Sequence, residues 1–211
     1  MAPRAYNNEL RLQQQAELKA RIAEAAAGLH KVKGALGTSY AEVAERADVS
    51  LPTVYKHFPT LDDLVVACTA HVAAAAPPFP AQRILEAADL GAAAEALVAG
   101  CDAAHAYFAP WSAWREQQRI SALATLLAQE RARLLELCQA VLARHAAGGS
   151  QRAAAAWWEA LLSFELRDRL LADHGQSRAA YRRTLVHLLL AVTGPQPASP
   201  TTTGPRRRSA P

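Results

Sequence analysis

The chain has 211 residues, of which 51% are hydrophobic and 20% charged, and its formal net charge is +4 at pH 7. This length suffices for one or two domains with a buried core, and the abundance of Ala, Leu, Glu, Arg and Gln predicts an all-α fold. Acidic and basic residues balance over residues 1–65, while three surplus arginines, Arg206–Arg208, lie near the end. Net charge alone therefore does not identify a nucleic-acid-binding protein.

Cys68, Cys101 and Cys138 are widely spaced and lie in apolar helical patterns. Because they form no C-x-x-C pair, we expect buried thiols and neither a metal site nor a disulfide framework. The N-terminus is polar, and no apolar run approaches the length of a membrane span. We therefore expect a cytoplasmic protein without a membrane partner.

The first predicted helix runs from about Glu9 to Val32, and Gly34 and Gly37 end it. Its apolar stripe comprises Leu18, Ile22, Ala25, Ala26 and Leu29.

Three shorter helices follow, each with its own start signal. Ser39 and Glu42 form a capping-box pattern that opens a helix through Arg46. Ser50 is expected to cap the next helix, with Pro52 in its first turn. Thr60 is expected to cap the fourth, whose first turn contains Asp62 and Asp63.

The first two of these helices form a compact pair within residues 39–58. A turn of about four residues, 47–50, joins them, and the inward positions are Val43, Ala44, Ala47, Val49, Val54 and Phe58. Ala44 is small enough to let the helices cross closely. This pattern is typical of a helix-turn-helix, whose second helix enters the DNA major groove.

The segment resembles the DNA-binding domain of the TetR family of transcriptional regulators, over about residues 16–68. The match rests on Leu64 and on Thr38-Ser39, Val43-Ala44, Ala47, Val49-Ser50 and Pro52–Phe58. Two positions depart from the family pattern. Asp48 replaces a turn glycine, which Asp tolerates at modest cost, and Leu61 replaces a lysine that meets a phosphate.

Helix geometry predicts which side chains of this segment meet DNA. Leu51, Pro52 and Thr53 should point into the groove. Tyr55 should reach a phosphate, Lys56 a phosphate or guanine, and His57 the backbone. Thr38 and Ser39 should offer donors to a further phosphate. The competing interpretations are that Tyr55 is partly core, Lys56 merely solvated and Ser39 only a cap.

Both ends of the chain are basic. Arg4 and Arg11 precede or begin the first predicted helix, where a disordered start competes with contact to a minor groove. The same two interpretations apply to Arg206–Arg208.

The rest of the chain predicts a helical bundle. The fourth helix ends at Pro77-Pro78, which divides a DNA-binding domain (1–76, with a linking helix over 61–76) from a bundle (81–193). Bundle helices are expected over about 82–88, 91–108, 111–145 (either continuous or broken near Gln118), 150–173 and 177–193. Residues 194–211 are rich in Pro, Ser and Thr, and are expected to be disordered.

The resemblance implies that this bundle forms a homodimer and binds a small-molecule effector. A dimer also follows from the need to hold two half-sites of a (pseudo)palindromic operator. The predicted interface comprises Trp157, Leu161, Phe164, Leu185, Leu188 and Leu189. The predicted effector pocket comprises Cys101, His105, Phe108, Trp111, Trp114 and Gln118, although the same aromatic stripe is also typical of an ordinary core.

No enzyme is predicted, since the seven histidines form no H-E-x-x-H motif and the chain has neither G-x-S-x-G nor a phosphate-binding Gly-rich loop. We expect no catalytic residues, no cofactor and no metal. The resemblance implies a repressor that its effector releases from the operator. The alternatives are a helical ligand carrier and a regulator controlled by a protein partner.

Overall fold

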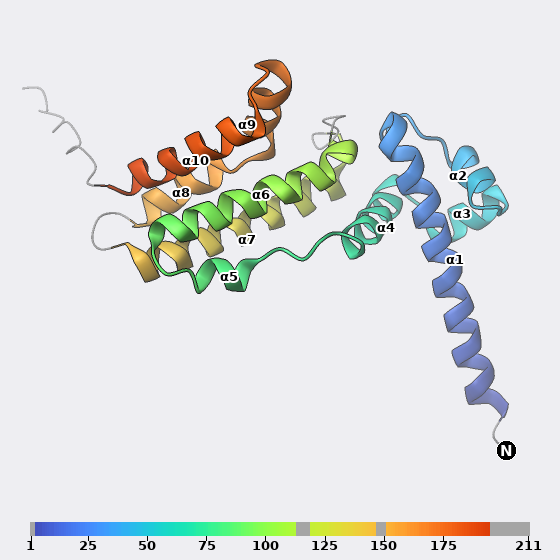
Figure 1. Cartoon of the computed structure of the whole chain (residues 1–211). Helices are drawn as coiled ribbons and strands as arrows, with labels where there is room; N and C mark the ends of the chain where they lie inside the picture. Colours follow the sequence, from blue (N-terminus) through green and yellow to red (C-terminus); the bar gives the residue numbers. More distant parts are fainter. Residues whose placement is uncertain (1–2, 113–118, 147–150, 195–211) are drawn as a thin grey trace, which may run out of the picture.

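The computed structural model describes residues 3–112, 119–146 and 151–194. Over these ranges the chain is all-α, as the composition predicts. Figure 1 shows two groups of helices: α1 to α4 lie on one side, and α5 to α10 form an elongated bundle on the other. The N-terminal part of α1 projects well beyond the helices packed around it.

The first group begins with α1 (Pro3–Lys33), which is longer than predicted because the helix already includes residues 3–8. The expected disordered start is therefore wrong for this stretch, and Arg4 and Arg11 are helical. Gly34 follows with φ +76°, the left-handed conformation of a helix C-terminus. Then come α2 (Tyr40–Arg46), α3 (Leu51–His57) and α4 (Leu61–Ala74).

The predicted helix starts are confirmed in atomic detail. The Ser39 hydroxyl accepts from the Glu42 amide while the Glu42 carboxylate accepts from the Ser39 amide, which completes the capping box. Thr60 and Asp63 form a second one, and Ser50 caps α3 by accepting from the Thr53 amide. Asp48 adopts φ +51°, so the turn keeps a left-handed residue without glycine.

The second group contains α5 (Ala81–Leu85), α6 (Leu90–Ser112), α7 (Ser121–His145), α8 (Gln151–Leu161), α9 (Phe164–Asp168), the π-helical turn η2 (Arg169–Asp173) and α10 (Arg178–Thr193). Two predicted helices are not continuous. Trp111 belongs to α6 and α7 begins at Ser121, so residues 111–145 do not form one helix; the break allowed near Gln118 falls outside the described residues. The expected 150–173 helix is interrupted at Ser163, whose hydroxyl accepts from the Leu166 amide and starts α9.

Each group has its own apolar core. Small side chains of α1 and α2 pack around Ile22, Val43, Val54 and Phe58 in the first, with Leu64 and Val72 from α4. Trp158, Tyr181 and Leu142 are among the fully or nearly fully buried side chains of the second. The three cysteines are buried in these cores, as expected, and burial raises the pKa of Cys68 to about 11 and those of Cys101 and Cys138 to about 12.

The two groups meet through α4 and the ends of α6 and α7. A small third cluster joins Ala35 and Val65 to Ile120, with Leu61 and Leu123 packed against it. The Tyr107 hydroxyl donates to the Val72 carbonyl at 3.0 Å, and the Trp111 indole donates to the Ala27 carbonyl at 2.9 Å. The end of α6 is thus bonded directly to α4 and α1.

Membrane insertion finds no support in the described part of the chain, where every helix is too short or too polar to serve as a transmembrane span.

Candidate nucleic-acid interface

The outer face of α3 carries most of the side chains predicted to contact DNA. Val54 is fully buried and Phe58 nearly so, which fixes the helix against the core. Leu51, Pro52, Tyr55 and Lys56 are exposed on the other side. Since residues four apart share a helix face, Leu51 stands beside Tyr55 and Pro52 beside Lys56.

Tyr55 is not part of the core, because 52% of it is exposed. Its ring rests on Tyr40 at the start of α2, with 4.7 Å between the ring centroids and an angle of 38° between the planes. The stacking leaves Tyr55 exposed while limiting its rotation. The aromatic pair therefore holds Tyr55 in place at the junction of α2 and α3.

Thr53 and His57 are only partly exposed. The Thr53 and Ser50 hydroxyls are 2.7 Å apart, so Thr53 belongs to the cap of α3 as well as to its outer face. Burial, followed by the charges of Lys19 and Lys56, lowers the pKa of His57 below its ordinary value. In the free chain both effects therefore favour the neutral imidazole.

Thr38 and Ser39 differ from the expectation that they offer free donors. The Thr38 hydroxyl donates to the Gly34 carbonyl at 2.8 Å, and its amide donates to the Ala35 carbonyl at 3.2 Å. Both the amide and the hydroxyl of Ser39 donate to Glu42. Lys33 also pairs with Glu42, and the hydrogen bonds from Lys33 and Ser39 lower the pKa of this carboxyl to about 2. Both residues thus use their donors within the protein.

Leu61, which replaces the lysine of the family pattern, has a packing partner. It lies against the cluster of Ala35, Val65 and Ile120 and so contacts the start of α7. The substitution exchanges a cationic side chain at the start of α4 for an apolar contact between the two helix groups.

The described residues of the predicted effector pocket lie in two different surroundings. Cys101 is buried in the bundle core, and the His105 ring meets Phe164 edge to face at 5.6 Å. Phe108 and Trp111 instead pack against the core of the first group, where Lys31 lies 5.3 Å from the Trp111 ring. Trp114 and Gln118 lie outside the described residues. Phe108 and Trp111 thus belong to the contact between the two groups.

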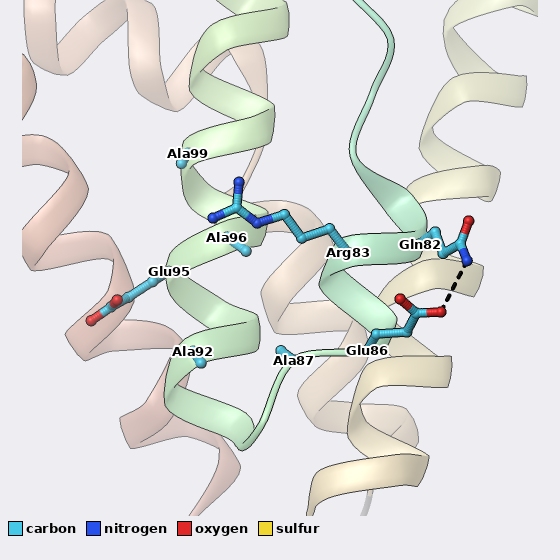
Figure 2. A pocket seen from close by; sticks show the side chains of 8 residues that line it. All are labelled: Gln82, Arg83, Glu86, Ala87, Ala92, Glu95, Ala96 and Ala99. Carbon is cyan, nitrogen blue, oxygen red and sulfur yellow. Dashed lines mark hydrogen bonds between the residues drawn. The ribbon is translucent and has the colours of Figure 1, made fainter.

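Two surface depressions occur elsewhere. One, of about 810 Å³, lies between α5 and α6, and Figure 2 shows Arg83 reaching across it toward Ala96. The other, of about 380 Å³, is lined by α1, α4 and Phe58. Neither is lined by a predicted effector residue.

The six predicted interface residues divide into three pairs by exposure. Leu185 and Leu189 are 2% and 0% exposed, so they belong to the core of the protomer and are not available to a partner. Leu161 and Phe164 are partly buried. Trp157 and Leu188 are 55% and 43% exposed, beside inward-facing neighbours that join α8 to α10: the Trp158 indole donates to the Leu189 carbonyl at 2.8 Å.

A charged cluster was missed in the sequence. Asp102 in α6 is fully buried, and it accepts hydrogen bonds from Arg167, Arg178 and Arg182 of α9 and α10. One signal was present, because Asp102 is the sole Asp, Glu, Lys or Arg between Glu95 and Arg115. A lone carboxylate in so apolar a helix requires a buried cationic partner.

The segment that carries the outer face of α3 matches a known family model. Residues 22–68 match the model described as bacterial regulatory proteins, tetR family. This segment is therefore a DNA-binding domain of the TetR family of transcriptional regulators, as the helix-turn-helix pattern indicated.

Solved structures share the fold over most of the chain. The multidrug binding protein EbrR, crystallised with imidazole, is 28% identical with a TM-score of 0.56, and the match covers 85% of this chain and 90% of that one. NalD of Pseudomonas aeruginosa, the secondary repressor of the MexAB-OprM multidrug efflux pump, is 19% identical with a TM-score of 0.52 and coverages of 84% and 96%. A transcriptional regulator from Rhodococcus sp. Rha1 is 20% identical with a TM-score of 0.54 and coverages of 82% and 95%. At these low identities, NalD and the Rhodococcus regulator show only that the fold is shared. Among curated proteins none matches significantly.

Proposed function

We propose that this TetR-family regulator represses transcription as a homodimer, and that a small-molecule effector releases it from a (pseudo)palindromic operator. The observation that carries the proposal is the exposed face of α3, where Leu51, Pro52, Tyr55 and Lys56 stand on a helix fixed by a buried Val54 and Phe58. One such helix contacts one half-site, so tight specific binding requires two.

The roles we assign follow the exposure of each residue. Leu51, Pro52 and Thr53 contact bases or thymine methyl groups, and Lys56 meets a phosphate or guanine. Tyr55, braced by Tyr40, donates its hydroxyl to a phosphate. Thr38 and Ser39 act first in capping, because their donors are used within the protein.

The dimer forms through the outer faces of α8 and α10 in this proposal. Trp157 and Leu188 supply exposed apolar side chains there, and Leu161 and Phe164 lie at their margin. A face with exposed Trp and Leu is the kind of surface that a partner buries. The two recognition helices would then stand about 34–36 Å apart, one turn of DNA.

Residues 1–76 form the DNA-binding domain of this proposal and residues 81–193 the regulatory bundle, with α4 shared between them. The repressor role is supported by the structural similarity to NalD, which is described as a repressor. Release requires that the effector bind more tightly to the state whose recognition helices no longer match the operator. Movement at the end of α6 would reach α1 and α4 through Trp111 and Tyr107.

The test is fluorescence anisotropy of the purified chain on DNA selected from a random library. Lys56→Gln should weaken binding and lower the slope of log K against log salt concentration by about 1, because one phosphate contact is lost. Arg131→Gln on α7 removes the same charge from an exposed site far along the bundle, and should leave the slope unchanged. Absence of sequence-selective binding by a folded dimer would refute the proposal.

A further inference from the structure

The strongest unexplained feature of the bundle is the Asp102 cluster, in which one carboxylate is shared by three guanidinium groups. Asp102 Oδ1 accepts from Arg167 Nε at 2.7 Å. Its Oδ2 accepts from Arg178 Nε at 2.8 Å and from Arg182 Nε at 2.5 Å. These bonds tie α6 to α9 and α10.

The cluster holds more positive charge than its carboxylate neutralises. Within this set of four side chains, three arginines against one aspartate leave a surplus of two charges. Burial would raise the pKa of Asp102, but the hydrogen bonds from Arg167, Arg182 and Arg178 outweigh it and lower that pKa. The carboxylate is thus already ionised at neutral pH, so it cannot neutralise more than one of the three arginines.

The surplus lies on the solvent side. The Arg167 side chain is 9% exposed, whereas those of Arg178 and Arg182 are 50% and 39% exposed. Both outer arginines meet the Asp102 side chain through Nε alone, and Arg178 Nη2 adds a long 3.5 Å contact to the Asp102 carbonyl. A guanidinium that is bonded only through Nε still presents its terminal pair of nitrogens, the fork that binds carboxylate or phosphate oxygens in pairs.

The positive potential extends to a neighbouring side chain. His105 lies one turn beyond Asp102 on α6, and its Nδ1 is shielded from solvent with no hydrogen-bond partner among the described residues. Burial and then the charge of Arg167 lower the pKa of His105 to about 4, against opposing contributions from Asp102 and Glu165. The ring is therefore neutral at pH 7 and adds no charge of its own.

The same helix connects this cluster to the DNA-binding half. From Asp102, α6 continues to Tyr107 and Trp111, which donate to the carbonyls of Val72 and Ala27. A change in how α10 holds Asp102 would shift the register of α6 against α1 and α4. The cluster is thus connected through α6 to α1 and α4, which pack around α3.

We propose that Arg178 and Arg182 bind a small anionic ligand, a carboxylate or a phosphate, which draws them from Asp102 and loosens α6 from α10. This inference rests on the proposed function, because it gives the effector its chemical class. The anion neutralises the surplus charge that Asp102 leaves, and bidentate contact with the outward guanidinium fork supplies its affinity.

The site is tested without DNA by isothermal titration of the full chain with inorganic phosphate and with succinate, at constant ionic strength set by chloride. We expect saturable binding of at least one probe, weakened about tenfold or more in Arg178→Gln and in Arg182→Gln. Arg183→Gln removes an exposed charge from the next position of α10 and should bind like the wild type. Saturation by phosphate alone or by succinate alone identifies which oxyanion the fork prefers.

Two results would overturn the site: no saturable binding of either probe, or equal affinities in the Arg182→Gln and Arg183→Gln proteins. Circular dichroism melting confirms that each variant is folded, and Arg182→Lys, which keeps the charge without the fork, should recover only part of the affinity.

The regulatory role is tested separately, by measuring the fluorescence anisotropy of operator DNA with and without phosphate or succinate. Release of DNA by the probe in wild type and Arg183→Gln, but not in Arg182→Gln, supports it, whereas anion binding that leaves operator affinity unchanged overturns it. Failure of operator binding itself would refute the proposed function while the titration still reports on the anion site.

Discussion

The two groups of helices have interiors of different chemistry. Around α3 the core is apolar and built largely from small side chains, and charged residues such as Lys56 remain on the outside. At the junction of α6, α9 and α10, a fully buried aspartate and a nearly buried arginine lie beside the apolar core. An apolar core gives a rigid platform for DNA contacts, whereas a charged junction responds to ions and pH.

The largest expected effect is at the charged junction. Asp102→Asn keeps the side-chain shape but leaves Arg167 buried without a negative partner, so we expect a loss of about 3–5 kcal/mol of unfolding free energy. Urea denaturation measures it, with Glu130→Gln, which breaks an exposed pair with Arg133, as the control near zero. A loss below about 1 kcal/mol would mean that the cluster contributes little to holding the bundle together.

The corresponding destabilising substitution in the apolar half is Phe58→Ala. Phe58 is 5% exposed and packs among the side chains that fix α3, so its truncation should cost about 3 kcal/mol. We expect the loss of unfolding free energy in Phe58→Ala to be independent of salt concentration, and the loss in Asp102→Asn to vary with it. Urea curves at low and high salt decide the point, and an equal salt response in both variants would contradict the contrast.

The second half should lose stability in acid through His105. The pKa of His105 in the folded chain is about 4, lower than in the unfolded chain, so the unfolded chain binds more protons between these values. The associated stability is complete above about pH 6.5 and is lost as the pH falls toward 4, by about 2 kcal/mol for this partly exposed group.

Unfolding free energies at pH 7, 6 and 5 measure this loss, and His105→Gln should flatten the dependence. His187→Gln, at an exposed position of α10, should not. An unchanged slope in His105→Gln would assign the acid response to another group.

The smallest effect should be the same in both halves. Ser39 caps α2 and Ser177 caps α10 through the same contact to a backbone amide, so each change to Ala should cost about 1 kcal/mol. Thermal melting measures both. If Ser39 also bound a phosphate, Ser39→Ala would weaken DNA binding more than Ser177→Ala, and we expect the two variants to bind DNA alike.

For the contact between the halves, the sequence indicated the residues but not their partners. Phe108 and Trp111 lie at helical spacing in an aromatic stripe, but periodicity does not say which neighbour a helix face meets. The structure directs Trp111 to α1. The break at Ser163 was missed because the apolar pattern on both sides of it fits one continuous helix, and one serine cap was enough to interrupt it.

The sequence by itself determined the local elements of the DNA-binding half. The caps at Ser39, Ser50 and Thr60 and the left-handed Asp48 depend on residues three or four positions apart, and these contacts form wherever the segment folds. Only the tertiary structure decided that Asp102 meets Arg167 and Arg182, 65 and 80 residues away, and that Leu61 packs near Ile120. Such pairings depend on how whole helices pack into a common core. The chain contains many arginines that could pair with the buried carboxylate, and only the packing of α9 and α10 against α6 selects these.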